Sequence, residues 1–262
     1  RVLWKRALPQ LGTFGVYYDE THADTPLSTA YNQVHIPGAN SRGTNYVATS
    51  EGIYVVLGDH CLVLDPRTGE TLRRIDLPAL TEGEGAPRWG YVGVYGDYLI
   101  AGAGAVQYTD FLDDVPEGKR NRFQDLDLTA SRHLVVMDRT SGKVWWTRRS
   151  ELGFRHNAIA VGGERIYCID RLPEPVAGAL RRRGREVAAQ PTLLALELRT
   201  GEVGWQTAEG VFGTWLSYSG EHDVLLQAGR KSRDMVIDEV SEGMTAYRGD
   251  TGQRLWTNAA RY

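Results

Sequence analysis

The stretch Leu62-Val63-Leu64-Asp65-Pro66-Arg67-Thr68-Gly69-Glu70 decides the fold, because its turn recurs along the chain. A Thr-Gly or Ser-Gly pair again follows an apolar, alternating run at Gly142, Gly201 and Gly252. In a tight hairpin, glycine supplies a positive φ angle, and Thr, Ser or Asp hydrogen-bonds the local backbone. One hairpin that returns with unequal padding is typical of a repeat protein.

A tryptophan stands at the fourth position after the glycine in most copies of this turn. The tryptophans in this register are Trp4, Trp146, Trp205 and Trp256. The copy at Gly69 has Arg73 instead, and Trp4 makes Arg1 the residue after a missing glycine. The pattern predicts that the chain starts with an orphan outer strand over 1–9 and is a segment of a larger ring of repeats.

Each unit contains a second, earlier hairpin. The clearest example runs from Asn45 to Leu57 around Ser50-Glu51-Gly52, and its counterparts span 91–101, 158–169 and 215–228. Two hairpins give every unit four strands, which we term A to D in chain order. Such units, repeated at roughly 40 to 50 residues, are the blades of a β-propeller. The expected blades are 45–78, 89–149, 155–208 and 213–258, with a long inter-blade insertion over 10–44.

The sequence therefore predicts an all-β, single β-propeller segment of about four complete antiparallel blades. An unrepeated β-sandwich is the competing architecture, but it leaves the recurring turn and the register of the tryptophans unexplained. With 262 residues and 42% hydrophobic content, the chain is long enough for a sizeable core. A net charge of −3 favours no nucleic-acid partner, and no apolar run approaches the roughly 18 residues of a membrane span.

A C strand, the turn Asp-x-x-Thr-Gly and a D strand with tryptophan together resemble the tryptophan-docking, PQQ-like β-propeller repeat of quinoproteins. The resemblance covers nearly the whole chain. It implies that the tryptophans pack between blades; ligand stacking is the alternative. The docking residues it implies are Trp4, Trp146, Trp205, Trp256, Gly69, Gly142, Gly201 and Gly252. Two turns depart from the pattern, since Glu197 replaces the aspartate and Arg248-Gly249-Asp250 shifts it, so weaker turn pairing is expected there.

Family members include dehydrogenases that bind pyrroloquinoline quinone (PQQ) and cofactor-free scaffolds. Many of the dehydrogenases resemble one another in an adjacent cysteine pair over the cofactor, which this chain lacks, although the pair could lie outside the segment. Cys61 and Cys168 occupy apolar strands of different blades, which favours buried thiols over a disulfide or a nucleophile. PQQ with calcium is therefore expected only if the chain is part of an oxidoreductase.

The long insertions all fall at one end of the predicted blades. They are 10–44 between D and A strands, and 105–131, 171–191 and 229–242 between B and C strands. The A–B and C–D turns stay short. Because binding residues concentrate on loops held by a rigid scaffold, this insertion rim is the predicted functional face.

Residues that lead into the A strands form the predicted ligand-binding group. They are Arg42, Thr44, Asn45, Arg88, Trp89, Arg155, His156, Asn157, Thr214 and Trp215. Three arginines at nearly the same place in three blades predict a cationic, aromatic-flanked mouth for a carboxylate, sulfate or phosphate. In the alternative interpretation, the arginines pair with loop acids and the tryptophans pack between loops.

Two charged clusters lie within the insertions. The acidic cluster comprises Asp110, Asp113, Asp114, Asp125 and Asp127. It lacks the spaced ligands of a calcium loop, so a solvated acidic loop is favoured over a metal site. The basic cluster, Arg181-Arg182-Arg183-Gly184-Arg185, suits a phosphate or an acidic partner, but a solvated, short-helical loop is favoured.

No spacing of histidines suits a shared metal, and no Gly-x-Ser-x-Gly nucleophile turn occurs. We therefore predict no catalytic and no metal residues. The favoured function is a non-catalytic binding or scaffold propeller outside the cytoplasm, periplasmic or secreted. Its expected partners are the remaining blades of the parent chain and a protein, carbohydrate or anionic ligand. The alternative is part of a PQQ-dependent oxidoreductase.

Overall fold

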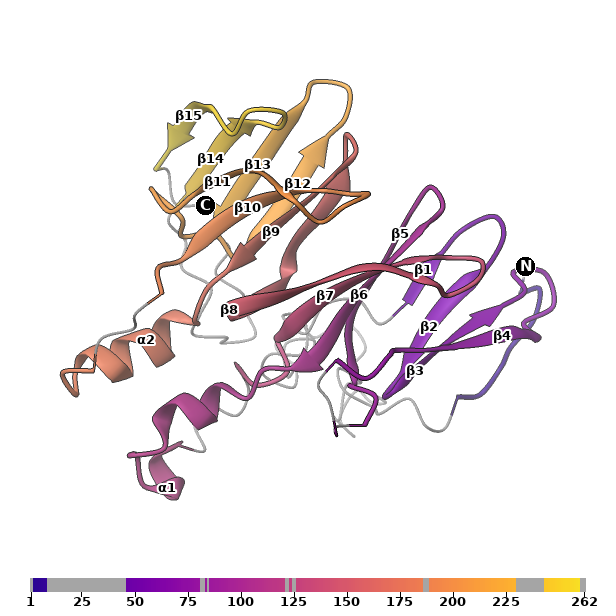
Figure 1. The fold of residues 1–262 in the computed structure, drawn as a ribbon, viewed down its shortest axis with the longest axis horizontal. Coiled ribbons are helices and arrows are strands. Elements are labelled where there is room, and N and C mark those ends of the chain that lie inside the picture. The colour runs from indigo at the N-terminus through magenta and orange to yellow at the C-terminus, as the bar shows by residue number, and fades with distance from the viewer. Residues whose placement is uncertain are drawn as a thin grey trace, which may run out of the picture.

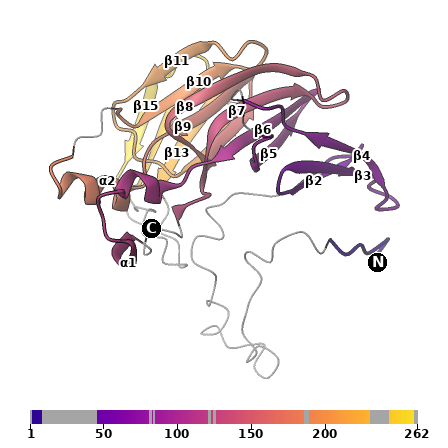
Figure 2. The same ribbon diagram turned by 60° about the horizontal axis from the view of Figure 1, so that its bottom comes forward.

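The computed structural model describes residues 2–8, 46–80, 83, 85–120, 123, 126–185, 189–229 and 243–259. Arg42, Thr44, Asn45 and Asp125, with most of the insertions 10–44 and 229–242, lie outside these residues. The described residues form antiparallel sheets that stand side by side in chain order (Figures 1 and 2). None of the helices found in these ranges is long and apolar enough to cross a membrane.

The first and last sheets are separate four-stranded blades. The first has the order β1-β2-β3-β4, with β1 (Tyr46–Ala48), β2 (Ile53–Leu57), β3 (His60–Leu64) and β4 (Thr71–Asp76). The last has the order β12-β13-β14-β15, with β12 (Trp215–Ser219), β13 (Val224–Gly229), β14 (Gly243–Arg248) and β15 (Arg254–Asn258). Each is a meander of two hairpins, as the sequence predicts.

The middle sheet has the order β11-β10-β9-β8-β7-β6-β5 and contains two blades joined by one strand. Its strands are β5 (Trp89–Tyr95), β6 (Tyr98–Ala105), β7 (Ala130–Asp138), β8 (Val144–Gly162), β9 (Arg165–Asp170), β10 (Thr192–Glu197) and β11 (Val203–Thr207). The first part of β8 pairs with β7 and its last part pairs with β9. Thus β8 is both strand D of the second blade and strand A of the third.

The bend within β8 is held by one carboxylate. Asp170 accepts hydrogen bonds from the backbone N–H groups of Glu151 (2.7 Å), Leu152 (2.8 Å) and Gly153 (2.7 Å). Gly153 has a φ of 130°, a conformation that side chains other than glycine rarely adopt. The chain therefore passes from one blade to the next without leaving the sheet.

Apolar side chains fill the spaces between the blades. On β7, Val135 and Met137 pack toward the first blade, whereas Leu134 and Val136 pack toward the third. This alternation follows from the two-residue period of a strand and buries both faces of the middle blades. Cys61 and Cys168 are free thiols in these layers. Burial raises the pKa of Cys61 to about 12, which argues against a reactive thiolate.

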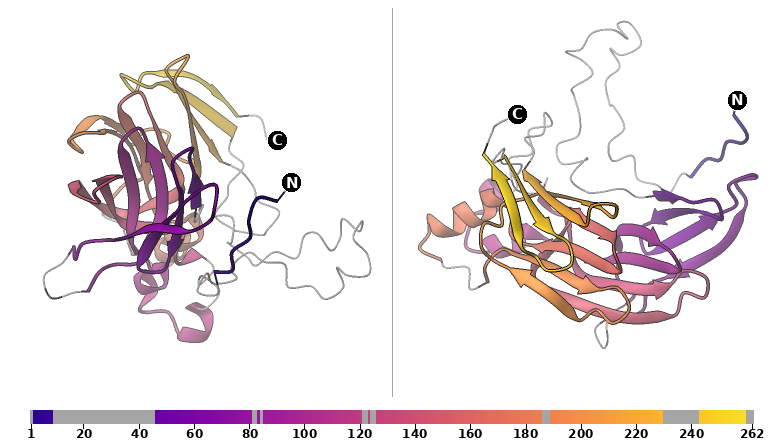
Figure 3. Two further views of the ribbon diagram at one scale, coloured as in Figure 1. Left: turned by 90° about the vertical axis from the view of Figure 1, so that its right-hand side faces the viewer. Right: turned by 90° about the horizontal axis from the view of Figure 1, so that it is seen from above.

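The first strands of successive blades lie next to one another: β1 contacts β5, β5 contacts β8, and β8 contacts β12. Together they line an inner groove of about 430 Å³. Figure 3 shows the same succession of sheets from two further directions. In the described residues, the protein is therefore a partial β-propeller of four-stranded blades.

Each turn glycine meets a residue from the preceding unit. Trp146 donates from Nε1 to the carbonyl oxygen of Leu198 (2.9 Å), and a Cβ on Gly201 would lie 2.6 Å from the indole. Trp4 and Trp205 make the equivalent contacts with Pro66 (2.9 Å) and Gly249 (2.7 Å). The side chain of Trp256 is 48% exposed.

The expected weakening of the two departing turns is not seen in their backbone. Glu197 and Arg248 each donate across their turn and accept from the turn glycine at 2.8 Å, as Asp65 and Asp138 do. The turns differ in the hydrogen bonds made by the side chain of the first turn residue. Asp65 and Asp138 accept bonds from their own turn N–H groups, whereas Glu197 accepts from Arg165 (3.2 Å). Glycine with φ near 70° is therefore sufficient for the backbone pairing.

Candidate functional site

The described members of the predicted ligand-binding group do not all line one hollow. His156, Asn157 and Trp215 line the inner groove, and Trp215 is 38% exposed. Trp89, Arg155 and Thr214 are buried, while Arg88 is exposed. Of the three arginines expected at the mouth, Arg155 is only 3% exposed, Arg88 is exposed, and Arg42 lies outside the described residues.

Arg155 and His156 attach the second blade's insertion to the sheet. Arg155 donates from Nη1 to Thr129 Oγ1 (2.5 Å) and lies 5.7 Å from the centre of the Tyr108 ring. His156 Nε2 lies 2.8 Å from Ser131 Oγ. Because Tyr108 and Thr129 belong to the insertion, Arg155 connects the insertion to strand β8.

The inner groove does not fit PQQ. Its lining side chains are apolar, aromatic, imidazole or amide, and they include neither lysine nor arginine. PQQ is a polycarboxylate and needs cationic partners. No group of three or more His, Cys, Asp or Glu converges in the described ranges to hold an accompanying metal ion. The described inner strands therefore provide no cofactor site of this kind.

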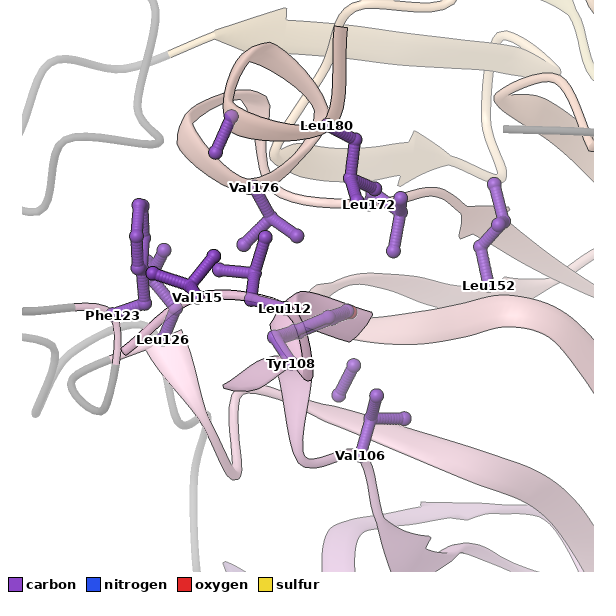
Figure 4. Close-up of a cluster of buried hydrophobic side chains, with 12 residues drawn as sticks. Val106, Tyr108, Leu112, Val115, Phe123, Leu126, Leu152, Leu172, Val176 and Leu180 are labelled. Atoms are coloured by element: carbon purple, nitrogen blue, oxygen red, sulfur yellow. The ribbon is translucent and has the colours of Figure 1, made fainter. Parts of the chain in front are cut away.

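The insertions of the second and third blades fold against each other into a small core of their own (Figure 4). The second blade's insertion contributes the 3-10 helix Tyr108–Leu112 and the short helix α1 (Glu117–Arg120), and the third blade's contributes α2 (Glu174–Arg181). Leu112 and Val176, from the two insertions, are fully buried in this cluster. Both insertions thus lie at one rim, and burial of their apolar surface holds them together.

The acidic and basic clusters are partners of each other. Arg185 Nη1 lies 2.9 Å from Asp113 Oδ1 and 2.8 Å from Asp114 Oδ1, and Arg183 lies 3.5 Å from Asp114. The hydrogen bond from Arg185 lowers the pKa of Asp113. Asp127 accepts instead from Thr109, through its N–H (3.1 Å) and its hydroxyl (2.8 Å). Each cluster is expected as a solvated loop; Asp113, Asp114 and Arg185 are exposed as expected, and their side chains pair with each other.

Arg171 joins this rim to the fourth blade. It is buried and donates from Nη1 to the carbonyl oxygen of Phe212 (2.7 Å), within the connection that leads into β12. Its own carbonyl oxygen accepts from Tyr108 (3.4 Å). Sequence reasoning missed Arg171; the available signal was a charged pair, Asp170-Arg171, at the end of an apolar strand and the start of an insertion.

A rim cavity of about 700 Å³ opens beside α2. Its apolar lining includes Leu152, Leu172 and Phe212, and its charged lining includes Arg181 and Arg185. Arg181 pairs with Glu174, about two turns earlier in α2. The side chains of Arg181 and Arg185 remain 62% and 42% exposed. Such a cavity suits a ligand that carries an apolar group next to an anion.

A smaller cavity of about 350 Å³ adjoins it and shares Leu152 and Arg185. It is further lined by Arg132, Arg149, Asp110 and Glu151. Arg185 therefore stands between two hollows of the same rim. None of the described members of the predicted ligand-binding group lines either of these two hollows.

No family model and no curated protein matches the sequence. Solved structures resemble the fold. A europium-containing methanol dehydrogenase matches with a TM-score of 0.50 at 11% identity, over 84% of this chain and 42% of that one. A quinohemoprotein alcohol dehydrogenase from Pseudomonas putida gives 0.49 at 12%, over 82% and 34%. BamB from Moraxella catarrhalis gives 0.42 at 13%, over 82% and 51%. The chain thus spans about a third to a half of these structures. The likeness to the europium-containing methanol dehydrogenase supports the propeller fold alone.

Proposed function

We propose that this chain is a non-catalytic binding propeller of the PQQ-like repeat type that holds a partner protein on its insertion rim. The observation that carries the proposal is the rim cavity of about 700 Å³, built on insertions with a hydrophobic core of their own. Apolar burial and ion pairs hold the two insertions together, so the rim presents a fixed shape. A fixed shape lowers the entropic cost of binding.

The chemistry of the cavity points to an acidic segment that carries a large apolar side chain. Phe212 and Leu172 contribute apolar surface to the lining of the cavity, and Arg181 and Arg185 contribute positive charge. A guanidinium has five N–H donors, so the bonds to Glu174, Asp113 and Asp114 leave donors for a ligand carboxylate. A carbohydrate would use the hydroxyl-binding capacity of the same groups and is the competing ligand in the test.

The wider assembly belongs to the same proposal. The indoles of Trp4, Trp146 and Trp205 act as blade-docking residues, and Trp256 would take the same role toward a further blade. Asn157 and Trp215, which line the inner groove, remain candidates for a weaker contact there. An extracytoplasmic location rests on the sequence resemblance alone. A PQQ-dependent activity is not favoured, because the described inner groove offers no cation for the cofactor's carboxylates.

The test is a fluorescence anisotropy titration with labelled peptides that combine Glu or Asp with Leu or Phe. The variant Arg181→Gln/Arg185→Gln should bind roughly tenfold or more weakly, because each charge-assisted hydrogen bond is worth about 1.5–3 kcal/mol. The matched control is Arg67→Gln/Arg254→Gln, which removes two exposed arginines that do not line the cavity. Melting temperatures of both variants show that the fold is intact.

Equal binding by both variants would contradict the rim as the site. Binding of oligosaccharides in place of acidic peptides would assign the cavity to carbohydrate. A separate arm adds PQQ with calcium and follows the melting temperature, since a ligand of the folded state must raise it. A rise would support the oxidoreductase alternative.

A further inference from the structure

A second groove, of about 640 Å³, lies at the opposite rim, where the short turns of the second and third blades meet. Its walls come from the start of β6, the start of β8 and the two turns of the third blade. The lining residues are Tyr98, Trp145, Glu164, Glu197, Arg199 and Glu202, with Thr200. Three glutamates and one arginine line this groove, whereas three arginines and one glutamate line the rim cavity.

Trp145 is exposed at a position where the fold does not require an aromatic residue. It precedes Trp146 in β8, so the alternation of the strand turns Trp146 inward (9% exposed) and Trp145 outward (52% exposed). The residues that precede the docking position in the other units are Leu3, Leu72, Gly204 and Leu255. An indole in place of leucine or glycine adds a flat π face to the surface of the groove.

The ring of Trp145 already attracts a cation. Lys143 Nζ lies 5.8 Å from its centre, within the range of a cation–π interaction. Tryptophan is the best aromatic partner for an ammonium or guanidinium group. The groove therefore has an aromatic wall of the type that recognises basic side chains.

Two of the glutamates are not explained by the turn structure. Glu164 adopts a φ of 62°, next to Gly163 at 59°, in a turn where glycine would carry no strain. Glu197 replaces the aspartate that caps the equivalent turns, and its side chain is 38% exposed beside Arg165. Glu164 thus brings a carboxylate to this groove on a strained backbone, and Glu197 pairs there with Arg165 instead of capping its turn.

We propose that this turn-rim groove docks a lysine- or arginine-bearing segment of a partner protein. A basic side chain would lie against Trp145, and neighbouring basic groups would pair with Glu164 and Glu202. The carboxylates of Glu164 and Glu202 select this occupant, and the exposed indole of Trp145 orients it. The site is independent of the insertion rim, so the chain would hold an acidic segment at one end of its blades and a basic segment at the other.

Fluorescence anisotropy with a labelled Lys/Arg hexapeptide tests this groove, with a Glu/Asp hexapeptide as the charge-reversed probe. The basic peptide should bind, and added salt should weaken it because the ion pairs are exposed. Trp145→Leu installs the residue found in sister blades and should weaken binding several-fold. Glu164→Gly/Glu202→Gln relieves the turn strain while removing two carboxylates, and should weaken binding tenfold or more.

The matched controls are Trp256→Leu, which removes another half-exposed indole, and Glu70→Gln/Glu117→Gln, which removes two exposed carboxylates elsewhere. Both should bind the basic peptide as the wild type does. Unchanged affinity in Trp145→Leu and in the glutamate variant would overturn the proposal. So would competition by spermidine as strong as that of the unlabelled peptide, since it would show a bare polyamine site.

Discussion

The junction between the second and third blades docks an indole, whereas the junction between the first and second blades docks a guanidinium. Trp146 covers Gly201 and donates to Leu198. Arg73 stands at the equivalent position and donates to the carbonyl oxygens of Arg139 and Thr140. Both docking residues reach the same carbonyl of the next turn, because Leu198 and Arg139 each follow the first residue of their turn.

The comparison shows that the conserved feature of this architecture within the chain is the satisfied carbonyl rather than the aromatic ring. A Cβ on Gly142 would find only Ile75 Cγ2 within contact, at 3.7 Å, so no flat ring covers this turn. The polar junction is supplemented by the ion pair between Arg139 and Glu51. We infer that the first junction depends on polar contacts and the apolar layer behind it, and the second on the indole itself.

The largest expected effect comes from deleting the indole. Trp146→Ala should lower the free energy of unfolding by about 3–5 kcal/mol, since it removes a large buried ring and leaves the Leu198 carbonyl without its donor. Arg73→Ala should cost about 1–2 kcal/mol, because water can reach the two carbonyls it leaves, one of which is exposed and the other partly buried. Urea unfolding followed by circular dichroism measures both. Equal losses would contradict the distinction between the two junctions.

The second prediction uses the two turn glycines as a matched pair. Gly201 and Gly142 have nearly the same φ, 72° and 74°, so alanine strains the backbone equally, by about 1–2 kcal/mol. Only Gly201 has an indole within 2.6 Å of the added methyl group. Gly201→Ala should therefore be less stable than Gly142→Ala by about 1–3 kcal/mol of overpacking, measured in the same unfolding experiment.

If the two alanine variants unfold alike, the indole moves aside without cost and does not hold the turn. Gly252→Ala provides a replicate, because Trp205 lies 2.6 Å from the corresponding Cβ position. It should follow Gly201→Ala rather than Gly142→Ala.

The blades were predictable from the sequence because local signals specify them. The turn glycines, the tryptophan register and the period-two alternation of β7 and β10 all lie within a few residues of the hairpin they define. The continuity of β8 was not predictable. It depends on Asp170, which reaches the bend from the next strand, and no local pattern marks that contact.

The rim was predictable as a location but not as a site. The positions of the insertions along the chain place them at one end of the blades. The sequence around Arg155 does not distinguish an arginine that lines a mouth from one that packs on Tyr108, as this one does. Likewise, Asp113 and Arg185 were each interpreted as members of separate solvated clusters. Their pairing depends on two insertions from neighbouring blades folding together, which only the three-dimensional arrangement reveals.

The smallest expected effect lies in the turn beneath Arg73. Asp138 Oδ1 accepts from the N–H groups of Ser141 (2.6 Å) and Thr140 (3.0 Å), and these bonds, with a smaller contribution from the Arg73 charge, lower its pKa. Because the pKa is lowered in the folded state, the ionised carboxylate stabilises the fold at pH values above the ordinary aspartate pKa of about 3.9. This stabilisation is lost as the pH falls through the lowered pKa.

The melting temperature of Asp138→Asn should therefore fall below that of the wild type at neutral pH, and the gap should close as the solution is acidified below about pH 3.9. Ser141→Ala is the partial control, because it removes the hydroxyl donor and leaves the backbone donors. A gap that persists or widens in acid would contradict the capping role. Glu197 pairs with Arg165 and does not cap its own turn. The pH-dependent stabilisation by a capping carboxylate is therefore expected in the turn that Arg73 contacts, and not in the turn that Trp146 contacts.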